Sequence, residues 1–177
     1  MRIAQKYFNL FIIICAAIAV IVIALTTIRY SQKQVLEFKN NLSEIDLNTI
    51  AFRTYLQADS LRISELAGSP VVIQFWATWS GKSGQVNHFL NEYQKAHPDL
   101  TVVAAAVRDG EEQIMEYIQE NNFHFDFVEG TVFYQQIYVP GIPAQILIGR
   151  DGELFDTHIG DEIQVLKNKL NHLIIHE

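Results

Sequence analysis

The strongest constraint on the fold of this chain is an aliphatic segment near its N-terminus. The run FIIICAAIAVIVIAL lies inside residues 7–28, which contain no ionisable side chain other than Tyr7 and Cys15. About 20 such residues in an α-helix cross the hydrocarbon core of a bilayer. The run therefore predicts a transmembrane helix through residues 7–28, and the rest of the 177-residue chain is long enough for one ordinary domain.

A cleaved secretory signal peptide is the main alternative for this segment, because Arg2 and Lys6 supply a basic N-terminal region. The apolar part of a signal peptide spans about 7–15 residues and ends in a small-x-small cleavage site. This run is longer and ends in Thr-Thr-Ile-Arg without such a site. We predict an uncleaved signal anchor over residues 1–29. Basic residues flank both ends of the run, so charge alone does not orient it.

The part of the chain beyond the anchor is acidic and has no thiol. The first 29 residues hold three of the 13 Lys and Arg and none of the 20 Asp and Glu, so residues 30–177 carry ten basic and twenty acidic side chains. This balance argues against nucleic acid or an anionic membrane surface as a partner of the domain. Cys15 is the single cysteine of the chain and lies in the anchor. The domain therefore has no cysteine for a disulfide, a nucleophile or a metal ligand.

Hydrophobic periodicity then alternates between that of strands and that of helices. Residues 30–46 mix polar and apolar side chains, and we interpret them as a tether with a short helix. Strands are predicted at residues 70–77, 101–107, 124–128, 145–149 and 153–160. Helices are predicted at residues 83–96, 111–121, 131–139 and 161–177. The last two strands are joined by Arg150-Asp151-Gly152 as a β-hairpin. The pattern predicts an α/β fold with helices on both faces of a mixed sheet.

Two separated motifs resemble one known family. The segment LRISELAGSPVVIQFWATWSGKSG resembles the membrane-anchored TlpA/ResA-like branch of the thioredoxin superfamily, in which FWATW is followed by C-x-x-C. The later segment VPGIPAQILIGRDGELFDTHIG is similar to that family's Gly-Ile-Pro turn, strand and hairpin. The resemblance covers about residues 47–177. It implies a thioredoxin-like fold and a cis Ile142–Pro143 bond beside the active-site loop.

The resemblance places serines where the family has its redox cysteines. Aligned on FWATW, the cysteine positions are Ser80 and Ser83, with Gly81 and Lys82 between them. In the family, the helix N-terminus lowers the pKa of the first cysteine. A serine hydroxyl forms no disulfide and needs a neighbouring base to become a nucleophile. Gln74 also replaces the buried acid of thioredoxins proper, and an amide accepts no proton at neutral pH. We therefore expect no catalytic residue in this motif.

The sequence argues against two other kinds of site at the same residues and leaves a third open. A P-loop would need glycine where Trp76 stands. Ser80 and Lys82 could form a nucleophile pair, but residues at a helix start more often act as caps and solvated charges. The free N–H groups of the helix start, together with Lys82, leave an anion site open.

The histidines do not form a recognisable metal-binding pattern. His172 and His176 are four residues apart on the predicted last helix, and His124 alternates with Asp126 on a predicted short strand. A metal site needs three or four converging ligands. We therefore expect no metal and no cofactor.

Two hypotheses of function follow from these residues. The first is a membrane-tethered, non-redox module that binds an extended peptide or an envelope protein in a groove. The groove would consist of Trp79, Ser80, Gly81, Lys82, Ser83, Ile142 and Pro143. The second is the family's thiol-disulfide oxidoreductase activity, which requires either that the serines are engineered or that a partner supplies the thiols. We expect the first, with the N-terminus in the cytoplasm and residues 30–177 on the periplasmic or extracytoplasmic side, as the resemblance implies.

Overall fold

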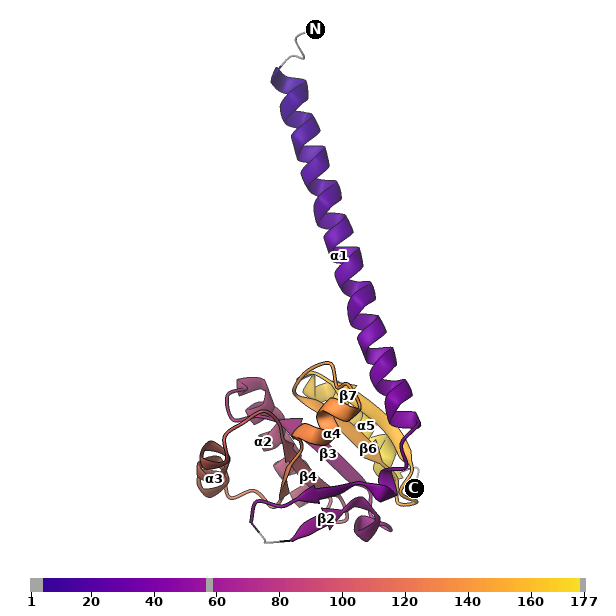
Figure 1. Cartoon of the computed structure of the whole chain (residues 1–177), viewed down its shortest axis with the longest axis vertical. Helices are drawn as coiled ribbons and strands as arrows, with labels where there is room; N and C mark the ends of the chain where they lie inside the picture. The colour runs from indigo at the N-terminus through magenta and orange to yellow at the C-terminus, as the bar shows by residue number, and fades with distance from the viewer. Residues whose placement is uncertain (1–4, 57–58, 176–177) are drawn as a thin grey trace.

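The first helix, α1 (Gln5–Ser43), contains the whole apolar run and projects away from the rest of the chain (Figure 1). The computed structural model describes residues 5–56 and 59–175. The predictions that involve Arg2, the side chain of Lys6 and His176 therefore fall outside the described part of the chain. The 39 residues of α1 make a helix roughly 58 Å long at about 1.5 Å per residue. The helix is thus much longer than the hydrocarbon core of a bilayer, which is about 30 Å thick.

The apolar part of α1 has the length and composition of a membrane-spanning helix. Within Leu10–Ser43, an 18-residue window reaches a mean hydropathy of 3.0, and none of this window is buried against the domain. Cys15 lies exposed on the same part of the helix. A long surface of bare aliphatic side chains marks a site of contact with a membrane or another protein. By these criteria α1 is a candidate transmembrane helix.

The C-terminal end of α1 belongs to the core of the domain. Phe38 and Leu42 are 0% and 1% exposed and pack in one hydrophobic cluster with side chains of the central sheet. Leu47, in the short 3-10 helix η1 (Leu47–Thr49), joins the same cluster. Residues four apart lie on one face of a helix, so this face of α1 is held against the domain. The structure thus differs from the tether that the sequence predicts for residues 30–46, because the helix is continuous to Ser43 and buries Phe38 and Leu42 against the domain.

Five strands form the main sheet in the spatial order β5-β4-β3-β6-β7. They are β3 (Val71–Trp76), β4 (Thr101–Ala106), β5 (Asp126–Glu129), β6 (Ala144–Ile148) and β7 (Leu154–Ile159). Strands β3, β4 and β5 are parallel, whereas β6 is antiparallel to β3 and β7 is antiparallel to β6. The predicted mixed sheet and its terminal hairpin are therefore confirmed.

A second, two-stranded sheet is absent from the sequence prediction. It pairs β1 (Ala51–Arg53) with β2 (Ser60–Arg62), and the 3-10 helix η2 (Ile63–Leu66) follows directly. A bridge between Thr54 and Val128 joins this hairpin to β5. Each strand has only three residues, which is too short for a period-two pattern to be recognised.

Helices cover both faces of the main sheet (Figure 1). The helices α2 (Gly81–Ala96), α3 (Glu111–Glu120) and α5 (Ile163–Ile175) contribute buried side chains to the cluster on one face. The end of α1, the hairpin β1–β2 and α4 (Thr131–Gln136) contribute to the cluster on the other face. Because both faces are covered, every residue of β3 is buried. Trp76, at the end of β3, is 0% exposed.

Candidate functional site

The candidate groove lies at one edge of the main sheet. Strand β3 ends at Trp76, and the antiparallel strand β6 begins at Ala144, which pairs with Phe75. The segment after β3 and the segment before β6 are therefore neighbours at this edge. The first carries the serine motif, and the second carries the Ile142–Pro143 bond, which is cis, as predicted.

The hydroxyl of Ser80 caps helix α2. Ser80 has an extended backbone, with φ −99° and ψ 100°, and its side chain accepts a hydrogen bond from the N–H of Ser83 at 3.2 Å. This is the usual role of serine at a helix start, where the first N–H groups lack partners within the helix. Ser83 itself is 0% exposed, and its Oγ makes no hydrogen bond within the described residues. The hydroxyl of Ser80 therefore caps helix α2, and the hydroxyl of Ser83 is buried.

Lys82 forms an ion pair across the edge of the sheet. Its Nζ lies 2.8 Å from Oδ1 of Asp161, in the segment that follows β7. The hydrogen bond that Lys82 donates to Asp161, with the charge of that carboxylate, raises the pKa of Lys82. The same hydrogen bond lowers the pKa of Asp161. Lys82 therefore stays protonated at neutral pH and cannot act as a base for Ser80, which argues against the Ser-Lys nucleophile pair.

Two buried glutamines stand in the sheet behind the motif. Gln74 and Gln145 face each other in the register of β3 and β6, and both are 0% exposed. The Nε2 of Gln145 donates a hydrogen bond to Oε1 of Gln74 at 2.6 Å. Gln74 stands where thioredoxins proper carry an acid, so the buried polar group at this position is a neutral amide pair. The sequence analysis missed Gln145, although a polar residue in the apolar run AQILI was a visible signal.

The loop that carries Trp79 is held from behind by Asp109. The N–H of Thr78 donates to Oδ2 of Asp109 at 2.5 Å, and the N–H of Gly110 donates to Oδ1 of the same carboxylate at 2.9 Å. With its backbone fixed in this way, the loop leaves the indole of Trp79 65% exposed. The sequence analysis missed this contact of Asp109 with the loop.

The cis-proline segment shows a similar division between buried and open groups. Pro143 is buried, and Ile142 is half-buried against the core. The carbonyl of Pro143 accepts a hydrogen bond from the N–H of Gly160 at 2.9 Å. Among the loop and turn hydrogen bonds of residues 5–56 and 59–175, none involves the backbone of Ile142. This segment can therefore offer a backbone N–H and carbonyl to a ligand.

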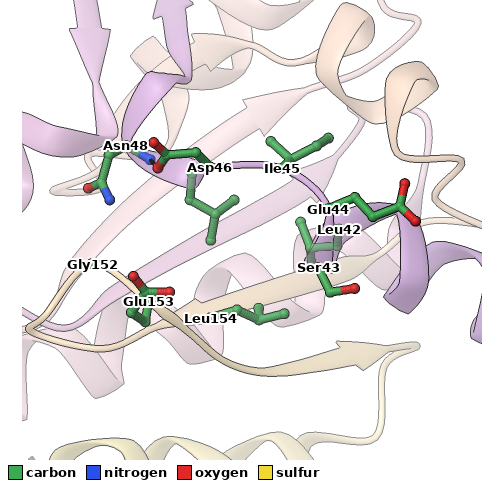
Figure 2. A pocket seen from close by; sticks show the side chains of 10 residues that line it. Leu42, Ser43, Glu44, Ile45, Asp46, Asn48, Gly152, Glu153 and Leu154 are labelled. Carbon is green, nitrogen blue, oxygen red and sulfur yellow. Dashed lines mark hydrogen bonds between the residues drawn. The ribbon is translucent and has the colours of Figure 1, made fainter.

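Three hollows in the described part of the surface lie outside the serine motif. One of about 470 Å³ lies between the end of α1 and the β6–β7 turn, where Glu44, Asp46 and Glu153 line it. Figure 2 shows that these carboxylates do not converge on one point. Another, of about 420 Å³, lies between α1 and the segment before β6. Within the described ranges, no group of three or more His, Cys, Asp or Glu side chains could hold a metal ion.

Comparison with known proteins places this fold among thioredoxin-like proteins. A family model described as thioredoxin-like matches residues 68–154. The thiol-disulfide oxidoreductase ResA of Bacillus cereus is 21% identical over 113 residues, which cover 62% of this chain and 65% of ResA. The chain thus matches slightly less than two thirds of the length of this curated relative.

Solved structures give the same result for the fold. The structure of MTB DsbF, in mixed oxidised and reduced forms, matches with a TM-score of 0.64 and 20% identity, over 73% of this chain and 98% of DsbF. StoA from Bacillus subtilis matches with a TM-score of 0.57 and 18% identity, over 71% of this chain and 99% of StoA. At these identities the similarity establishes the shared fold alone.

Proposed function

We propose, from the premise that this chain is a thioredoxin-like protein of the TlpA/ResA-like family, that it is a membrane-anchored binding module with no redox activity of its own. The observation that carries the proposal is the state of the two hydroxyls at the family's cysteine positions. Ser80 caps α2, and Ser83 is buried. The one nearby amine, on Lys82, is held protonated by Asp161. These residues offer no nucleophile and no electron-transfer pair.

The groove retains what is needed to bind an extended peptide. The open backbone of Ile142 can pair with a peptide strand, as in strand addition at a sheet edge. The exposed indole of Trp79 provides an apolar wall for a side chain of that peptide. Gly81 and Lys82 are both exposed at the start of α2, beside this wall. Main-chain pairing would supply affinity, and the contact with Trp79 would supply selectivity.

We place residues 30–177 outside the cytoplasmic membrane, with the N-terminus in the cytoplasm. The resemblance to the membrane-anchored TlpA/ResA-like family supports this orientation, and the apolar helix near the N-terminus provides the anchor. C-terminal fusions to alkaline phosphatase and to green fluorescent protein would test it. Active phosphatase with dark fluorescent protein is expected. Bright fluorescence with inactive phosphatase would reverse the topology.

A second candidate is thiol-disulfide exchange, the activity named for the relative ResA. The matching fold and the cis-proline segment favour it. It would require a partner to supply every thiol, because residues 30–177 contain no cysteine. Reduction of insulin disulfides by the purified full chain distinguishes the two candidates. Turnover above a no-protein control would favour the exchange reaction.

The binding proposal is tested by selecting peptides on the full chain held in lipid nanodiscs. Peptides are selected on the wild type and counter-selected on Trp79→Ala, and their affinities are measured by fluorescence anisotropy. Leu56→Ala is the matched control, because Leu56 is 58% exposed and lies between β1 and β2. Strand addition predicts that N-methylation of one alternate set of peptide amides abolishes binding, whereas the other set is tolerated. Equal affinity for wild type and Trp79→Ala would contradict the proposal.

A further inference from the structure

The path of α1 across the domain fixes which edge of the sheet faces the membrane. At its C-terminal end, residues 42–48 share a hollow with residues 152–154, the turn between β6 and β7 (Figure 2). About one turn earlier, Lys39 lies beside residues 154–157 at the start of β7. Traced toward its N-terminus, the helix therefore leaves the β6–β7 turn and runs along the outer strand.

The same helix reaches the groove edge before it enters its apolar run. Gln34 and Glu37 share a hollow with Tyr138 and Pro140, in the segment that leads into β6. Since β6 starts at the groove edge and ends at the β6–β7 turn, α1 crosses the domain from the far edge to the groove edge. The part of α1 that continues beyond Gln34 leads directly into the apolar run.

The distance from the groove edge to the bilayer is short. Gln34 lies six residues beyond Ile28, the last residue of the predicted membrane segment 7–28, which corresponds to about 9 Å along the helix. The headgroup region adds roughly 5–8 Å on each side of the hydrocarbon core. Phe38 and Leu42 fix the helix in the domain core, so this spacing is set by packing. With Ile28 at the end of the hydrocarbon core, the groove edge therefore lies at the outer limit of the headgroup layer.

Large exposed side chains stand at this edge. Trp79 follows β3 and is 65% exposed, and Tyr138 precedes β6 and is 72% exposed. Val132, just after β5, is 73% exposed. Tryptophan and tyrosine are the residues enriched at membrane–water interfaces, because their rings are apolar and carry a polar group. In Figure 1, α4 and the connection from α4 to β6 lie on the side from which α1 projects.

We propose that this edge, formed by residues 77–82, 130–132 and 137–143, rests on the headgroup layer of the bilayer that α1 spans. Trp79 and Tyr138 are the contacting side chains. The carboxylates of Asp109 and Asp161 stand at this edge together with two cations, Lys82, which pairs with Asp161, and Arg108, beside Tyr138. The charges are balanced, so the occupant is a zwitterionic lipid surface rather than an anionic one. The inference rests on α1 crossing a bilayer and does not depend on what the groove binds. One consequence is that ligands reach the groove along the membrane surface.

The two tryptophans make this contact measurable. Trp76 is 0% exposed and Trp79 is 65% exposed, so quenching by lipid-borne spin labels reports mainly on Trp79. The full chain is reconstituted in phosphatidylcholine vesicles that carry a spin label on the headgroup. We expect the fractional loss of emission to be severalfold larger for the wild type than for Trp79→Phe. A Tyr138→Trp reporter in the Trp79→Phe background should restore the larger loss.

Two further reporters in the Trp79→Phe background serve as controls. Leu56→Trp lies in the β1–β2 connection, which the antiparallel bridge between Thr54 and Val128 directs toward the start of β5, at the opposite edge. It should be quenched no more than the background. Val20→Trp, in the apolar run, should be quenched by lipids labelled deep in the acyl chain.

Two results would overturn the proposal. If Trp79 is quenched no more than Leu56→Trp while Val20→Trp is quenched, the edge faces water and is open to a protein partner instead. If Val20→Trp is not quenched, α1 does not insert and the premise fails.

Discussion

Replacing Phe38 by alanine tests whether the long apolar helix α1 and the domain form one folded unit. Phe38 is 0% exposed and packs in the cluster that includes β3 and β6. Truncating a buried phenylalanine removes apolar contacts and leaves a cavity, at a cost of about 3–5 kcal/mol. The whole stability of a domain is only about 5–15 kcal/mol. Phe38→Ala should therefore fold but be close to the limit of stability.

The effect can be read as a shift of the urea midpoint in detergent, followed through the emission of the tryptophans. With a loss of about 4 kcal/mol and an m-value of about 2 kcal/mol/M, the midpoint should fall by about 2 M. Leu36→Ala is the control, because Leu36 lies on the same helix and is 59% exposed. Its effect should stay within about 0.5 kcal/mol. Equal urea midpoints for the two variants would show that Phe38 does not pack in the domain core. Residues 30–46 would then be a tether separate from the domain.

Three other predictions follow from the site and the sheet. The Ser80→Cys, Ser83→Cys double variant should form an intramolecular disulfide under mild oxidation, because the two residues are one helical turn apart; thiol titration that finds none would show the alignment to be wrong. The full chain should reduce insulin disulfides no faster than a no-protein control, and turnover by protein free of contaminating thioredoxin would refute this. Burial lowers the pKa of His158, and Lys169 lowers it further, against the opposing effect of Glu162. The unfolded chain then binds the proton more readily than the folded one, so this contribution to stability is lost as the pH falls through about 6.5. His158→Gln should reduce the change of the urea midpoint with pH between about pH 7.5 and 5.5. The same pH dependence in wild type and His158→Gln would contradict the assignment.

The sequence predicts the main sheet because its strands are long and buried. Strand β3 is apolar at every position except Gln74, and the hairpin β6–β7 has a clear turn sequence. The hairpin β1–β2 escapes prediction because three-residue strands depend on tertiary contacts, such as the bridge from Thr54 to Val128. The end of α1 is similar, since the spacing of Phe38 and Leu42 indicates a helix face but does not identify what covers it.

The site divides in the same way. The serine positions are read from the short motif that follows FWATW, and the cis bond at Pro143 is predicted from the family resemblance. The groups that hold the site in place are distant in sequence. Gln145 lies 71 residues from Gln74, and Asp109 lies 31 residues from Thr78. Such partners are fixed by strand register and loop packing, which hydrophobic periodicity does not encode.

The central claim is that the groove binds a peptide without thiol chemistry. The most direct measurement is the dissociation constant of a selected, cysteine-free peptide for the full chain in nanodiscs. It is determined with and without reductant, and again after alkylation of Cys15, the one thiol of the chain. The account predicts the same dissociation constant in all three conditions, weakened by about tenfold or more in Trp79→Ala, as for an aromatic residue that dominates an interface. Binding that requires a cysteine in the peptide, that changes with reductant, or that is unaffected by Trp79→Ala would contradict it.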